Sequence, residues 1–105
     1  MELSKGILFV RPDGILNRNT SYKINNYLVP VILKHKIKYL VFNLDKLLDI
    51  DETGIDALLN TKYAIKNNNG NLYLCEINKE ISKKINKWHI KKIENEVIAK
   101  KIIEV

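Results

Sequence analysis

The segment Asp51-Glu52-Thr53-Gly54 carries the groups in this chain that are best placed for chemistry. Residues 39–44 before it are short, β-branched and aromatic, which is typical of a strand buried on both faces. After it, apolar residues recur at helical spacing as far as the turn at residues 67–70. Thr53 is therefore predicted at a helix N-terminus beyond the carboxyl end of a strand, where partners and ligands bind in open α/β sheets. A hydroxyl there can be phosphorylated, because the helix dipole and free backbone amides stabilise negative charge.

The same residues also fit a purely structural interpretation. Thr53 and Asp56 are spaced as in a capping box, in which the hydroxyl accepts a bond from a backbone amide and the carboxylate reaches back. In this alternative, Thr53 only caps a helix. The choice between the two interpretations depends on the rest of the chain.

Composition limits the classes of protein that this chain can belong to. Its 105 residues predict a single domain over 1–105, and no apolar run is long enough to span a membrane. The N-terminus lacks the pattern of a signal peptide, and Cys75 lies alone in an apolar run, so we expect a cytoplasmic protein with a buried thiol. The net charge of +6 comes almost wholly from lysine. This bias argues against direct reading of nucleic-acid bases, for which arginine is preferred, and favours acidic partners.

The elements alternate along the chain in a way that predicts an α/β fold. Strands are expected at 7–10, 38–44, 71–77 and, at an edge, 89–93; helices are expected at 21–35, 54–66, 78–88 and 94–102. Pro30 should kink or end the first helix near Leu28, and Leu47, Leu48 and Ile50 are assigned to a loop. The turn Pro12-Asp13-Gly14 separates the first strand from Ile15-Leu16 and makes an initial hairpin-like element. After it, this order predicts a mixed, mostly parallel sheet of four to five strands with about four helices.

Three places in this order carry a family resemblance. Gly14-Ile15-Leu16-Asn17 with Thr20 is similar to a Gly-x-Leu-Asp…Thr pattern that leads into a first helix. Leu40-Val41-Phe42-Asn43-Leu44 followed by Asp51-Glu52-Thr53-Gly54 looks like a strand and its Asp-Ser-Ser-Gly signature, and Asn69-Gly70-Asn71-Leu72-Tyr73-Leu74 matches the turn and strand beyond. The chain thus resembles the STAS family, which contains the anti-sigma-factor antagonists of bacteria.

The resemblance implies a protein-binding switch and no enzymatic activity or cofactor. Thr53 occupies the position of the phosphorylated second serine, and Asp51 would orient its loop and assist phosphoryl acceptance. The implied partners are an anti-sigma factor of the ATP-dependent kinase type and a phosphatase. The implied partner surface comprises Asn17, Asn19, Asp51, Glu52, Thr53, Gly54, Ile55, Ala57 and Leu58.

Two departures from the family pattern affect this surface. Glu52 replaces the first serine and places a permanent carboxylate beside the acceptor hydroxyl. A phosphate would add about −1.5 to −2 charge to these carboxylates, so phosphorylation should be harder to accommodate. Asn17 replaces the usual aspartate and removes a charge.

The sequence is also compatible with other functions. The fold resemblance also allows a scaffold subunit, without phosphorylation, in a stress-sensing complex or a transporter. Asp49, Asp51, Glu52 and Asp56 could bind Mg²⁺, but an exposed acidic loop around a helix start explains them better. Lysines of the third predicted helix could bind nucleic acid weakly, but Trp88 falls on the apolar side of that helix.

Overall fold

The computed structural model describes residues 1–103 and contains two sheets. The larger sheet has five strands in the order β1-β2-β4-β6-β7, and the smaller one pairs β3 with β5. All neighbours are parallel except β1 and β2, which form an antiparallel hairpin. The strands are β1 Glu2–Ser4, β2 Ile7–Val10, β3 Gly14–Leu16, β4 Tyr39–Asn43, β5 Leu47–Ile50, β6 Asn71–Cys75 and β7 Lys91–Ile93.

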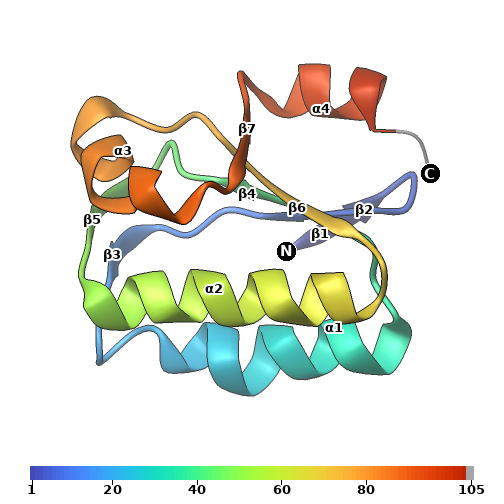
Figure 1. Cartoon of the computed structure of the whole chain (residues 1–105), viewed down its shortest axis with the longest axis horizontal. Helices are drawn as coiled ribbons and strands as arrows, with labels where there is room; N and C mark the ends of the chain where they lie inside the picture. The colour runs from blue at the N-terminus through green and yellow to red at the C-terminus, as the bar shows by residue number, and fades with distance from the viewer. Residues whose placement is uncertain (104–105) are drawn as a thin grey trace.

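Helices lie on both faces of the larger sheet. Figure 1 shows α1 and α2 side by side on one face and α4 on the other, with α3 near the small sheet. The α-helices are α1 Val29–His35, α2 Glu52–Asn67, α3 Lys79–Ile85 and α4 Glu96–Ile102; a π-helical turn, Ile24–Leu28, precedes α1 and a 3-10 turn, Asn86–Trp88, follows α3. The predicted α/β class, the mostly parallel sheet and the four helices are confirmed.

The hairpin at the start of the chain differs from the expected one. It is formed by β1 and β2, and its turn uses Lys5 and Gly6 with φ values of 52° and 82°. Gly14, in the turn that the sequence indicated, has φ of 85° and begins β3 instead. β3 thus leaves the large sheet and joins a second one.

The loop predicted around Leu47, Leu48 and Ile50 is wrong, because these residues form strand β5. Leu47 and Ile50 are buried, whereas Leu48 is 75% exposed. Pairing with β3 supplies the backbone hydrogen bonds that make this segment a strand. The amide of Asp51 then donates to the carbonyl of Leu16 at 3.1 Å, so the small sheet fixes where α2 begins.

Pro30 changes the helix without ending it. The amide of Val29 donates to the carbonyl of Ile24, which is the wider π-helical spacing, and normal helix geometry continues to His35. A proline has no amide to donate and crowds the preceding turn, so a π-turn before it is a physically reasonable accommodation. The predicted disturbance near Leu28 is present as this change of spacing.

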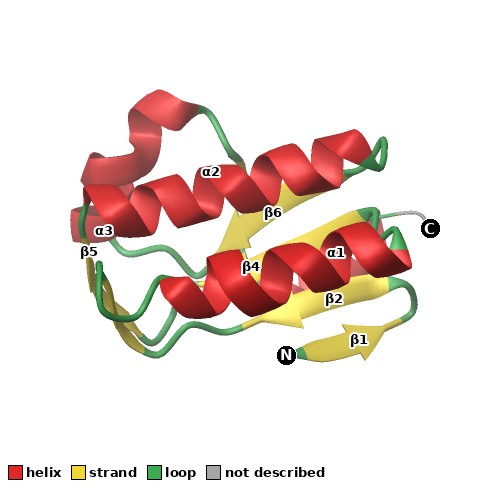
Figure 2. Ribbon diagram, turned by 90° about the horizontal axis from the view of Figure 1, so that it is seen from below, coloured by secondary structure: helices red, strands yellow, loops and turns green. Residues whose placement is uncertain are grey.

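Two hydrophobic clusters lie on the two faces of the sheet. The larger includes Leu40, Phe42 and Leu74 with apolar residues of α1, α2 and α3. The smaller lies under α4 and comprises Ile7, Phe9, Val41, Cys75, Ile93, Ala99 and Ile103. Figure 2 shows how α1 and α2 cover the first face along the length of β2, β4 and β6. Because α2 belongs to the larger core, its start is held in a fixed position.

Candidate functional site

Asp51, not Thr53, caps α2. Asp51 has extended backbone angles, φ −108° and ψ −173°, and its Oδ1 accepts a hydrogen bond from the Gly54 amide at 3.0 Å. Thr53 is the second residue of the helix itself. The capping-box alternative for Thr53 and Asp56 is therefore wrong, because the extended residue that precedes the first helical turn is Asp51.

Thr53 lies at the N-terminal turn of α2 and is partly exposed. Among the side-chain hydrogen bonds of residues 1–103, none involves its hydroxyl. The Asp51 carboxylate accepts a hydrogen bond from the Gly54 amide. The amides of Glu52 and Thr53 belong to the first helical turn and have no intrahelical acceptor. The hydroxyl is thus uncommitted and lies where the helix dipole favours negative charge.

Gly54 allows the first turn of α2 to touch the small sheet. It is buried, and a Cβ at this position would lie 2.5 Å from the carbonyl oxygen of Leu16 and 2.7 Å from Cγ1 of Ile50. A side chain here would push the helix away from β3. Gly54 therefore allows the helix start to pack closely against β3 and β5, and because it is buried it exposes little surface to a partner.

Asn17 and Asn19 lie next to this helix start. Asn17 follows Leu16, whose carbonyl accepts the Asp51 amide at 3.1 Å. The loop is held by its own hydrogen bonds: Asn17 Oδ1 accepts from the Asn19 amide at 2.9 Å, and the Asn17 amide donates to Thr20 Oγ1 at 2.9 Å. The structure thus brings the two asparagines beside the 51–54 segment, and Asn19 is exposed.

The remaining predicted contact residues divide between core and surface. Ala57 and Leu58 are 0% exposed in the larger cluster, so the expectation that they contact a partner is wrong: their side chains are directed toward the sheet. Ile55 is partly exposed and packs on the edge of that cluster. Asp51 and Glu52 are exposed.

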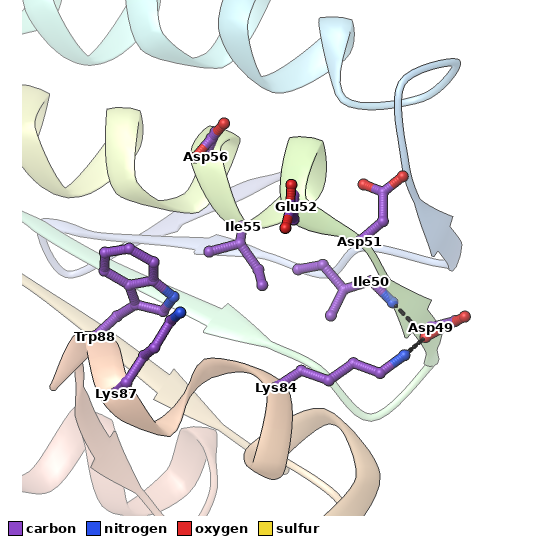
Figure 3. A pocket seen from close by; sticks show the side chains of 9 residues that line it. All are labelled: Asp49, Ile50, Asp51, Glu52, Ile55, Asp56, Lys84, Lys87 and Trp88. Atoms are coloured by element: carbon purple, nitrogen blue, oxygen red, sulfur yellow. Dashed lines mark hydrogen bonds and ion pairs between the residues drawn. The ribbon is translucent and has the colours of Figure 1, made fainter.

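A groove of about 520 Å³ lies along the exposed side of this helix start (Figure 3). One wall comes from Asp51, Glu52, Ile55 and Asp56, and the other from α3 and the 3-10 turn after it. The lining residues are Asp49, Ile50, Asp51, Glu52, Ile55, Asp56, Lys84, Lys87 and Trp88. The groove therefore combines acidic, basic and apolar groups.

Lysines of the second wall contact the other groove residues directly. Lys84 forms an ion pair with Asp49, which holds the pKa of that carboxyl below its usual range. The ammonium of Lys87 lies 5.1 Å from the centre of the Trp88 ring, a cation–π distance. Trp88 is thus both a packing residue and a groove residue, and its sequence pattern indicated only the first role. The sequence holds no signal for the groove role, because α3 and β5 are far apart in sequence and come into contact only in the folded protein.

The carboxylates around the helix start are not arranged as a metal site. In the part of the chain that the structure describes, no group of three or more His, Cys, Asp or Glu side chains could hold a metal ion. The carboxylate of Asp49 forms an ion pair with Lys84, and the carboxylate of Asp51 accepts a hydrogen bond from the Gly54 amide. Within residues 1–103, no helix is long and apolar enough to cross a bilayer.

Comparison with known proteins places this geometry in a family. The sequence profile described as STAS domain matches residues 1–102. An anti-sigma F factor antagonist from Paenibacillus polymyxa is 27% identical over 109 aligned positions, which cover 100% of this chain and 93% of that protein.

Solved structures show the same fold at low sequence identity. The anti-sigma factor antagonist SpoIIAA in its unphosphorylated form superposes with a TM-score of 0.81 at 13% identity, covering 98% of this chain and 96% of that one. A sulfate transporter family protein from Wolinella succinogenes gives a TM-score of 0.70 at 16% identity, covering 84% of this chain and 70% of that one. Because the STAS domain profile matches residues 1–102 of this 105-residue chain, the chain belongs to the STAS domain family.

Proposed function

We propose that this protein is an anti-sigma-factor antagonist. It would act in the cytoplasm by binding an anti-sigma factor and thereby releasing a sigma factor, with no catalytic step of its own. The proposal is supported by similarity over the full chain to a protein named anti-sigma F factor antagonist. The fold of SpoIIAA, an antagonist of the same kind, adds support at the level of architecture.

The proposed partner surface is centred on the first turn of α2. Asn19, Asp51, Glu52 and Thr53 present polar groups there, and Ile55 adds a partly exposed apolar side chain. Asn17 borders this set, and Gly54 lets it lie close to the β3 loop. An interface needs an apolar contact surrounded by polar groups, and this surface provides both.

Thr53 is the proposed point of control. A partner of the ATP-dependent kinase type would phosphorylate its hydroxyl, and a phosphatase would restore it. The observation that carries this proposal is the uncommitted, partly exposed Thr53 hydroxyl at the N-terminus of α2. A phosphorylated form of the Bacillus protein SpoIIAA is known and has the same fold, with a TM-score of 0.79 at 13% identity.

Charge explains how phosphorylation would separate the complex. A phosphate adds about −1.5 to −2 charge at neutral pH and binds water strongly. Asp51, Glu52 and Asp56 already carry negative charge beside the acceptor, so the added charge would be repelled and costly to bury in an interface. No rearrangement of the fold is needed.

The test is capture of partners from a lysate of the source organism by wild type, Thr53→Ala and Thr53→Glu, read by mass spectrometry. We expect wild type and Thr53→Ala to recover an ATP-binding anti-sigma factor, and Thr53→Glu to lose it. Asn60→Glu adds the same charge farther along the exposed side of α2 and serves as the matched control. Equal recovery by wild type and Thr53→Glu would contradict the switch.

A scaffold role without phosphorylation is the alternative, and the transporter-family structure is the observation that favours it. In that case the same capture would return other STAS proteins or transporter subunits. Their recovery would be independent of the residue at position 53. Thr53 would then be one more polar residue of the first helical turn.

A further inference from the structure

At the opposite end of α2 from Thr53, a small hollow collects positive charge. It has a volume of about 120 Å³, and its polar lining comes from Lys62 and Lys66 of α2, Asn71 of β6, His89 just before β7 and Lys91 at the start of β7. These residues come from three parts of the sequence. They meet because β6 follows the end of α2 and pairs with β7 (Figure 1).

Two of the lysines converge on one atom. The ammonium groups of Lys66 and Lys91 donate to Asn71 Oδ1 at 3.1 Å and 3.2 Å. They therefore lie within roughly 6 Å of each other, a separation at which like charges repel. Lys62, which is partly buried, lines the same hollow.

No negative group compensates this charge within the described residues. No carboxylate lines the hollow, and none of its three lysines takes part in an ion pair in residues 1–103. The dipole of α2 accounts for a lysine at its last turn, such as Lys66. It does not account for Lys91, which comes from the edge strand β7.

We propose that this hollow binds a phosphate-type dianion, either free phosphate or the phosphate group of a small metabolite. A phosphate offers several acceptor oxygens, and the site surrounds them with ammonium donors from two elements. The side-chain amide of Asn71 and the imidazole of His89 add further donors. Attraction of the dianion to both ammonium groups offsets the repulsion between Lys66 and Lys91, which is the physical gain. The site is independent of the proposed function at Thr53.

The test is an NMR titration of the full-length, ¹⁵N-labelled chain with sodium phosphate and, separately, with adenosine monophosphate, at constant ionic strength. We expect saturable shifts of the Asn71, Ile90 and Lys91 amides with a dissociation constant in the millimolar range. A double variant, Lys66→Gln with Lys91→Gln, should bind about tenfold more weakly, since two exposed charge contacts are lost. Lys83→Gln on α3, which removes one charge elsewhere, should bind as wild type does.

Comparing the two ligands distinguishes a site for free phosphate from a site for the phosphate group of a small metabolite. Equal affinity for both would assign the site to free phosphate, whereas tighter binding of the nucleotide with extra shifts at Leu72 would assign it to a small phosphate ester. Either result supports the site. Shifts that never saturate, or an equal loss of affinity in Lys83→Gln, would overturn it. A thermal melt monitored by circular dichroism checks that all the variants are folded.

Discussion

The two faces of the five-stranded sheet differ in how far apolar packing and charge each hold their helices. On one face, α1 and α2 bury a large apolar cluster, and the start of α2 touches the small sheet at Gly54. On the other, the seven-residue helix α4 covers a smaller cluster. Its first residue, Glu96, accepts hydrogen bonds from Arg11 at 2.8 and 2.6 Å and from Asn43 at 2.7 Å.

This difference predicts that the two faces respond differently to substitution and to pH. The candidate site lies on the face fixed by apolar packing, which depends little on salt or pH. The attachment of α4 depends more on charge, because a guanidinium and a carboxylate fix its first turn. Substitutions on the first face should therefore have larger effects on stability than those on the second.

The largest effect is expected from Leu58→Ala in α2. Leu58 is 0% exposed in the larger cluster, so its truncation leaves a cavity and should cost about 3 kcal/mol of unfolding free energy. Ile98→Ala in α4 removes a partly buried residue and should cost less. Urea unfolding of both variants measures the difference. Equal losses of unfolding free energy in the two variants would contradict the expected difference between the two faces.

Gly54→Ala should have the next largest effect. The new methyl group would lie 2.5 Å from the Leu16 carbonyl oxygen, so the helix start must move at a cost of about 2 kcal/mol. Amide NMR shifts should concentrate at Asn17 and along the first turn of α2. Asn60→Ala, an exposed position of the same helix, is the control. A stabilised Gly54→Ala protein would show that the close approach is unimportant.

Arg11→Ala should loosen α4 with a smaller cost, about 1 kcal/mol, because Arg11 is itself partly exposed. Cys75 reports this loosening: it lies in the cluster under α4, is 0% exposed, and burial raises the pKa of its thiol to about 12. We expect its reaction with a soluble disulfide reagent to become faster. Lys84→Ala breaks the ion pair with Asp49 and should leave this rate unchanged.

The smallest effect is a pH dependence of α4. Hydrogen bonding to Arg11 holds the pKa of Glu96 below its ordinary value. A lowered pKa in the folded state means that Glu96 stabilises the protein above its unfolded pKa of about 4.3, and that this contribution is lost as pH falls through the folded value. The difference in unfolding free energy between wild type and Glu96→Gln should shrink on acidification. A difference that stays constant down to low pH would exclude this role.

Local pattern was sufficient for the main elements. Strands β2, β4 and β6 were predicted because their apolar runs are short and bounded by turn residues, and α2 because its apolar residues follow helical spacing. A helix cap also depends only on residues three apart, and Asn78 caps α3 in this way: its Oδ1 accepts a hydrogen bond from the Ile81 amide at 2.9 Å. The buried state of Cys75 followed from its apolar neighbours.

The errors arose where long-range pairing decides the structure. Strand β5 looked like a loop because its partner, β3, lies about thirty residues away in sequence and supplies the hydrogen bonds. The same pairing holds Asp51 in an extended conformation directly before α2. Asp51 therefore caps the helix in place of Thr53. Trp88 and Lys84 joined the site only through the packing of α3 against β5.

The sequence by itself determined the class of the fold, the order of its main strands and helices and the hydroxyl at position 53, because each depends on neighbouring residues and their periodicity. Tertiary structure alone decided that Ala57 and Leu58 are buried while Ile55 is partly exposed. It also decided which lysines gather at the two ends of α2. These properties depend on which face of an element meets another, and that choice is made by packing and strand pairing across the whole chain.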